Sequence, residues 1–260
     1  MVRFGLILLV FSAIASLSSA EERIPVDLEL VLAVDVSRSM DYDELSLQRE
    51  GYAAALEHPA VTSAFGMGRL GRIALMYFEW GGPGRNRVLV PWTVLSGPED
   101  AAAAAAQLRA APISGLRGTS ISGAMEAAHL WIEANDYVGT RRVVDISGDG
   151  PNNRGRPVTE VRAELTRAGI EVNGLPFMVK APGGSYSIPD LDFYYEDCVI
   201  TGDSAFVIPI QDMDRLIGSI RQKLVLEIAG LQPERPARLR PAGITDCMIG
   251  EKLRRSWERN

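Results

Sequence analysis

Five oxygen-bearing side chains occupy three short polar segments of this 260-residue sequence: Asp35, Ser37, Ser39, Thr119 and Asp149. The first three form an Asp-x-Ser-x-Ser pattern, the fourth follows a glycine, and the fifth lies between two glycines. Because residues two apart in an extended segment point to the same side, the first three side chains can converge. Carboxylates and hydroxyls, with no histidine or thiolate among them, favour a hard divalent cation. Mg²⁺ is expected first, with Mn²⁺ or Ca²⁺ as alternatives.

Each polar segment adjoins an element that would hold it in place. The near-continuous apolar run 28–35 ends at Asp35, and the run 142–147 ends two residues before Asp149. Such runs are typical of parallel strands that are covered on both faces. Thr119 begins a segment, 119–135, in which apolar residues recur at helical spacing. Open α/β sheets bind ligands beyond the carboxyl ends of their strands, so these loops are the ones expected to carry a ligand site.

Strand-like and helix-like segments alternate along the rest of the chain. Further strands are expected at 72–80, 87–92, 170–179 and 206–210, and further helices at 41–58, 99–111, 158–168 and 211–229. Only a glycine-rich turn separates the strands 72–80 and 87–92, so the second should be an antiparallel edge strand, where Pro91 is tolerated. The pattern predicts a doubly wound, Rossmann-like α/β sheet, mostly parallel with one antiparallel edge strand and with helices on both faces.

The first 20 residues have the features of a secretory signal peptide. Arg3 is followed by an apolar run to about Leu17 and then by small residues ending at Ala20. The run is shorter than the roughly 20 residues that span a bilayer, so we expect cleavage and no membrane anchor afterwards. This predicts export, to the periplasm first and to the extracellular space as the alternative. The mature chain then divides into a domain at 21–230 and a C-terminal extension at 231–260.

The net charge and the cysteine content limit the classes of binding partner and the cellular compartment that fit this protein. The chain carries a net charge of −6 and 47% hydrophobic residues, which indicates a folded, acidic protein and argues against a nucleic-acid partner. Its two cysteines are Cys198 and Cys247. An even pair in an exported protein indicates a disulfide, which would tie the extension back to the domain. Two separate free thiols are the alternative.

The three polar segments, in this order and at this spacing, resemble the metal-ion-dependent adhesion site of the von Willebrand factor A family. The likeness covers about 26–229 and extends to an uncharacterised group of bacterial periplasmic proteins of this fold. It implies that Ser37, Ser39 and Thr119 bind one cation through their hydroxyls, while Asp35 and Asp149 act at least partly through water. It also implies an open coordination position for an acidic side chain of a protein partner. The expected function is therefore cation-dependent protein binding, in adhesion or assembly, and not catalysis.

Two other functions remain open from the sequence. A metal-assisted hydrolase would use the same cation to activate water. A structural protein would keep the motif as a relic, with Asp35 and Ser37 merely capping the next helix.

Two further features have alternative interpretations. Asp145 lies within an apolar run, so a buried carboxylate there needs a partner. We favour an ion pair with Arg141 or Arg142 over a supporting role at the metal site. The segment 181–200 contains Tyr186, Tyr194 and Tyr195, for which packing under a loop is favoured over a binding surface.

Overall fold

The computed structural model describes residues 23–179, 187–234 and 245–259. The expected signal peptide lies outside these residues, as do Tyr186 and part of the C-terminal extension. In the part of the chain that is described, no helix combines the length and apolar character needed to cross a membrane.

Five strands form one sheet in the order β3-β2-β1-β4-β5. They are β1 (Ile24–Asp35), β2 (Ile73–Trp80), β3 (Asn86–Leu95), β4 (Tyr137–Gly148) and β5 (Glu171–Pro176). β1 pairs in parallel with β2 and β4, β4 pairs in parallel with β5, and β3 runs antiparallel to β2 at the edge. This confirms the predicted mostly parallel sheet with one antiparallel edge strand.

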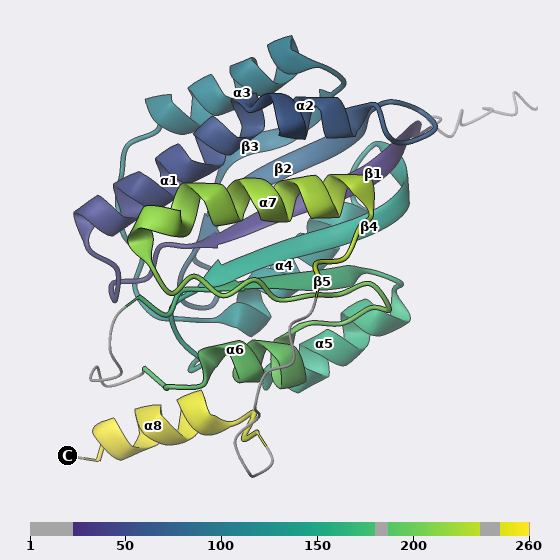
Figure 1. Ribbon diagram of the computed structural model, residues 1–260. Helices are drawn as coiled ribbons and strands as arrows, with labels where there is room; N and C mark the ends of the chain where they lie inside the picture. The colour runs from purple at the N-terminus through teal and green to yellow at the C-terminus, as the bar shows by residue number, and fades with distance from the viewer. Residues whose placement is uncertain (1–22, 180–186, 235–244, 260) are drawn as a thin grey trace, which may run out of the picture.

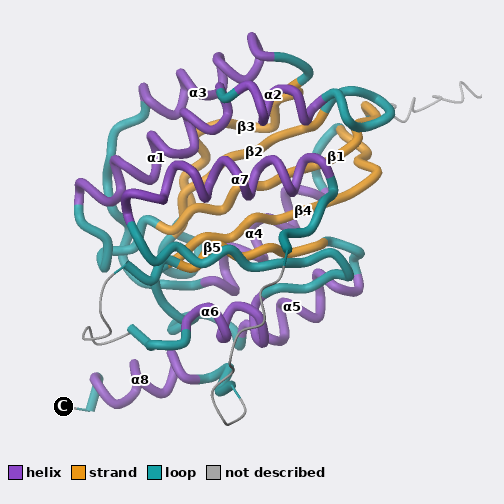
Figure 2. Tube along the Cα trace, viewed as in Figure 1, coloured by secondary structure: helices purple, strands orange, loops and turns teal. Residues whose placement is uncertain are grey.

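Helices cover both faces of the sheet (Figure 1). One face carries α1 (Tyr42–Glu57), α2 (Pro59–Phe65), α3 (Pro98–Ala110) and α7 (Leu216–Ala229). The other carries α4 (Ile121–Glu133), α5 (Val158–Arg167) and the short α6 (Leu191–Tyr194), which continues into the π-helical turn η1 (Tyr195–Val199). The layers are also visible in the trace coloured by secondary structure (Figure 2).

The central strand β1 contributes to two separate hydrophobic cores because its side chains alternate between faces. Leu30 and Leu32 pack in the core beneath α1 and α7, whereas Val31 and Ala33 pack in the core beneath α4 and α5. All four side chains are fully buried. From Leu30 to Val34 the strand is therefore apolar on both faces, and the polar side chain that follows at its buried carboxyl end is Asp35.

One expected strand is not formed. The segment 206–210 makes only isolated parallel bridges to the β5 side of the sheet, at Val207 with Gly174 and at Ile210 with Phe177. Ile208 N–H donates to Gly174 O and Ile210 N–H donates to Pro176 O, but Pro176 has no N–H to donate back to Ile208 O, which interrupts a regular ladder. The expectation of a sixth strand was therefore wrong.

Three helical segments were not predicted from the sequence: α2, the α6–η1 segment, and α8 (Ile249–Trp257). In the α6–η1 segment Tyr194 and Tyr195 are fully buried, in agreement with the packing role favoured for them. The helix beginning at Pro59 follows α1 after one residue, His58, whose ring accepts a hydrogen bond from the Ala60 N–H. Pro59 at the first helical position of α2 separates it from α1, which corresponds to the helix expected at 41–58.

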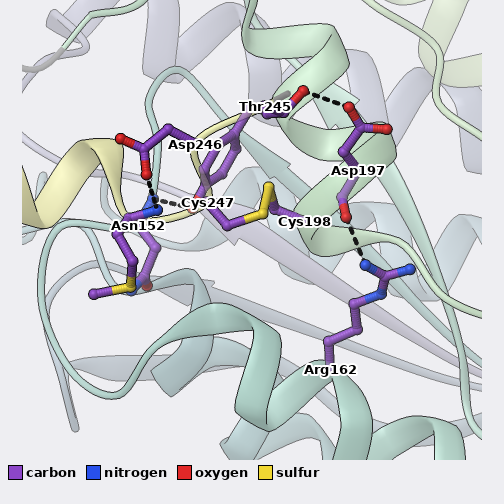
Figure 3. Close-up of a disulfide and its surroundings, with 9 residues drawn as sticks. Asn152, Arg162, Asp197, Cys198, Thr245, Asp246 and Cys247 are labelled. Carbon is purple, nitrogen blue, oxygen red and sulfur yellow. Dashed lines mark hydrogen bonds between the residues drawn. A yellow bond between two sulfur atoms is a disulfide. The ribbon is translucent and has the colours of Figure 1, made fainter. Parts of the chain in front are cut away.

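A disulfide joins Cys198 of η1 to Cys247, with the two Cα atoms 5.5 Å apart (Figure 3). The expected pairing is thus present. Around it, Arg162 of α5 donates a hydrogen bond of 2.6 Å to the Asp197 carbonyl, and the Thr245 hydroxyl contacts the Asp197 carboxylate. After the disulfide the chain enters α8, in which Glu251 accepts a 2.7 Å hydrogen bond from Asn152. The disulfide therefore holds α8 against the loop that follows β4.

Candidate metal centre

The first polar segment is fixed between the end of β1 and the start of α1. The backbone N–H of Val36 donates to Trp80 O at 3.0 Å, and the Leu116 N–H donates to Val36 O at 2.7 Å. At the other end, Asp41 and Glu44 form a reciprocal capping box, with hydrogen bonds of 2.8 and 2.9 Å. The loop between Asp35 and Asp41 is therefore anchored at both ends.

The second and third polar segments are joined to one another by their backbones. Thr119 O accepts hydrogen bonds from the N–H groups of Asn153 and Arg154, both at 3.2 Å. The Ser120 N–H donates to Gly81 O at 2.9 Å, which attaches the second segment to the end of β2. Gly118 has φ +84°, a left-handed conformation that suits glycine and turns the chain into α4.

The five expected ligand residues gather at the carboxyl edge of the sheet. The Ser37 N–H donates to Asp35 Oδ1 at 2.7 Å, the hydroxyls of Ser37 and Ser39 lie 2.9 Å apart, and Ser39 Oγ donates to Asp149 Oδ1 at 2.8 Å. These bonds link four of the five residues, with Asp35 joined through the Ser37 backbone. Thr119 lines the same cavity as Ser37, Ser39 and Asp149, and this cavity measures about 580 Å³.

The buried carboxylate of Asp35 fits a cation. Asp35 is 0% exposed, and its Oδ2 has no hydrogen-bond partner among the described residues. Burial, and then the negative charge of Asp149, raise the pKa of Asp35 well above its ordinary range. A cation between these carboxylates would offset both effects, and the surrounding donors are oxygen atoms of the kind that hard cations bind.

Asp145 does not pair with the residues that we favoured. Its Oδ1 lies 2.8 Å from Nζ of Lys223 on α7. Arg141 instead donates to the Glu227 carbonyl at 2.6 Å, and Arg142 donates to the Glu133 carboxylate at 2.8 Å. Arg142 is one of the alternate residues of β4 that face away from Asp145. The interpretation as a structural ion pair was right, but the partner was wrong.

Lys223 has a second acidic neighbour in this buried cluster. Nζ of Lys223 also contacts the carboxylate of Glu227, one helical turn later, and Asn173 Nδ2 donates to Glu227 Oε1 at 2.9 Å. Two carboxylates thus share one ammonium group without exposure to water. Burial, and then the charge of Asp145, raise the pKa of Glu227 to about 8.

The raised pKa of Glu227 predicts a pH-dependent stability. From about pH 4.5 to about pH 8 the folded protein keeps a proton that the unfolded chain releases, so the free energy of unfolding falls as the pH rises through this window. Glu227→Gln should make that slope shallower. Urea unfolding across the window would measure it, with Glu258→Gln, an exposed partner of Arg254, as the control. Equal slopes in the wild type and Glu227→Gln would contradict the prediction.

Solved structures of low sequence identity share this fold. Proximal thread matrix protein 1 of the mussel byssus, described with a zinc-occupied metal-ion-dependent adhesion site (MIDAS) motif, aligns at TM-score 0.54 and 14% identity over 78% of this chain and 46% of that one. The von Willebrand factor type A protein from Catenulispora acidiphila gives 0.52 and 16% over 78% and 43%. The pilus adhesin SpaC from Lactobacillus rhamnosus GG gives 0.57 and 13% over 79% and 30%.

The fold is therefore von Willebrand factor A-like, as the resemblance implied, and the chain spans less than half the length of these three structures. A search of curated proteins finds no significant match. A family model described as a protein of unknown function, DUF1194, matches residues 25–232, which is most of the chain, so this protein belongs to that family.

Proposed function

We propose that this protein is an exported, divalent-cation-dependent protein-binding module that acts in adhesion or assembly. In this proposal Ser37, Ser39 and Thr119 hold the cation through their hydroxyls, and Asp35 and Asp149 hold it at least partly through water. The bound cation attracts a carboxylate of a protein partner into the position that these residues leave open. Mg²⁺ is the expected ion. The observation that carries the proposal is the buried Asp35 Oδ2 without a hydrogen-bond partner among the described residues, beside the cavity that the other four residues line.

Two further observations support the proposal. The structures with this fold include an adhesin and a matrix protein whose MIDAS motif holds zinc. The Cys198–Cys247 disulfide suits an oxidising compartment, for which the periplasm is our proposal after removal of residues 1–20. We assign residues 21–230 to the binding module and 231–260 to an extension that the disulfide holds in place.

A paired substitution tests the assignment of the hydroxyls. In the double variant Ser37→Ala, Ser39→Ala, the cation loses two neutral oxygen donors while every charged group remains, so its affinity for Mg²⁺ should fall at least about tenfold. Isothermal titration calorimetry would measure this, with parallel titrations of Mn²⁺, Ca²⁺ and Zn²⁺ to identify the preferred ion. Ser63→Ala, an exposed serine of α2, is the matched control. Wild-type affinity in the double variant would mean that the motif does not bind the ion.

A further inference from the structure

The cavity at the candidate metal centre is larger than a cation and one carboxylate require. Its volume of about 580 Å³ falls within the roughly 300–1,000 Å³ of sites that enclose whole organic ligands. Beyond the polar loops its wall is apolar, made by Met40, Phe177, Met178, Ile188, Leu191 and Met213. Three of these side chains are buried and the other three are half-buried. The cavity thus offers an apolar compartment directly beside the oxygen donors.

Two arginines stand at the polar side of the same cavity. Arg38 and Arg154 line it and are exposed, and within the described residues neither guanidinium forms an ion pair. Arg154 lies over the second polar segment, since a Cβ placed on Gly118 would come within 3.0 Å of its Cδ. Among the described residues of the lining, the acidic ones are Glu44 and Asp149. With a divalent cation bound, the lining would carry net positive charge on a chain whose net charge is −6.

We propose that the partner presents an acidic residue next to a large apolar residue in an extended segment. This rests on the proposed function, because the acidic side chain is the group that completes the cation's coordination. Arg154 attracts the same carboxylate or a neighbouring one. The adjacent leucine- or phenylalanine-sized side chain fills the apolar compartment, where its burial adds affinity that the carboxylate alone does not supply. Charge complementarity and the apolar wall together select an acidic–apolar peptide over a purely acidic one.

Short labelled peptides test this selectivity on the full mature chain. Two series, Gly-Gly-Asp-X-Gly-Gly and Gly-Gly-X-Asp-Gly-Gly, carry glycine, leucine, phenylalanine or lysine at X, and binding is followed by fluorescence polarisation in MgCl₂ and in EDTA. In at least one series, the peptide with leucine or phenylalanine at X should bind at least about tenfold more tightly than the glycine peptide. This is the difference in affinity expected from burying one such side chain. Lysine should bind most weakly because it meets the two arginines and the cation. Asparagine in place of the aspartate should remove the dependence on Mg²⁺.

Substitutions in the wall separate the peptide site from the metal site. Met178→Glu and Arg154→Gln should each weaken binding of the leucine peptide about tenfold without lowering the Mg²⁺ affinity, which calorimetry measures in the absence of peptide. Met213→Glu is a second wall variant in case Met178→Glu unfolds, which thermal melting reports. The matched controls are Leu130→Glu, 69% exposed on α4, and Arg69→Gln, just before β2 at the opposite end of the parallel strands.

Each outcome bears on a different claim. If calorimetry detects no bound ion, the proposed function fails. If the ion binds but all peptides of both series bind with equal affinity, the proposed partner chemistry is overturned and the metal site is left standing. The same conclusion follows if the ion binds but no peptide binds more tightly in Mg²⁺ than in EDTA. Equal losses in Met178→Glu and Leu130→Glu would also overturn it, because the effect would then not depend on the cavity.

Discussion

Replacing Lys223 by methionine is expected to lower the free energy of unfolding by about 3–5 kcal/mol at neutral pH. Lys223 is fully buried on α7, with its Nζ 2.8 Å from Asp145 and in contact with Glu227. Its Nζ also lies 5.2 Å from the centre of the Phe206 ring. Methionine has a similar length but no charge, so the packing is largely kept while the buried carboxyl groups of Asp145 and Glu227 lose their only shared cation among the described residues. Urea unfolding measures the change.

Two controls separate the charge effect from a packing effect. Lys252→Met removes an ammonium group that pairs with Asp246 at 2.7 Å but is 61% exposed, and exposed pairs contribute about 0–1 kcal/mol. Adding Asp145→Asn and Glu227→Gln to Lys223→Met replaces both buried carboxyl groups by neutral amides and should recover most of the lost stability. A triple variant as unstable as Lys223→Met alone would attribute the loss to packing.

The sheet was predictable because its signals are local. Within the run 28–35, residues 30–34 are apolar on both faces, as expected for a central strand with a core on each side, and the structure buries them on both sides. The antiparallel edge followed from the short turn between β2 and β3. The segment 206–210 misled because its residues favour a strand, whereas the proline that interrupts its pairing, Pro176, lies in β5.

The convergence of the candidate ligands was predictable from topology, but their surroundings were not. Parallel strands β1 and β4 end at the same edge of the sheet, so loops 110 residues apart in sequence meet there, as Ser39 and Asp149 do. In contrast, the partner of Asp145 comes from a helix that starts about 70 residues later, and several lysines and arginines fit the sequence pattern equally well. The pairing of buried charges that are distant in sequence depends on which helix covers which strand. No local sequence pattern predicts that arrangement.

The apolar wall of the cavity likewise could not be predicted from the sequence. Met178, Leu191 and Met213 belong to separate segments, and each reads as an ordinary core residue in its own context. Only the assembled fold shows that they leave a hollow beside the polar loops. The role of α8 was hidden for the same reason, because Glu251 reaches the loop after β4 through Asn152, far from it in sequence.

We expect the Asp35→Asn variant to be at least as stable as the wild type without metal, and less stable than the wild type once Mg²⁺ is added. Without metal, the variant should unfold at the same temperature as the wild type or higher, because it removes a buried carboxylate whose ionisation is opposed by burial and by Asp149. With Mg²⁺ at about 100 times its dissociation constant, the wild type should gain about 2.7 kcal/mol. The variant loses one of two carboxylates at the site, so it should bind the ion at least about tenfold more weakly and gain at least about 1.3 kcal/mol less.

Thermal melting of both proteins in EDTA and in MgCl₂ measures this reversal. Asp136→Asn is the matched control, since Asp136 is exposed just before β4, at the end of the sheet opposite to the site. It should gain as much from Mg²⁺ as the wild type. A structural role for Asp35 as a helix cap predicts a different result, namely a variant that is less stable than the wild type by a similar amount in both buffers. The crossing of the two stabilities therefore distinguishes a carboxylate held for a cation from one that serves the fold alone.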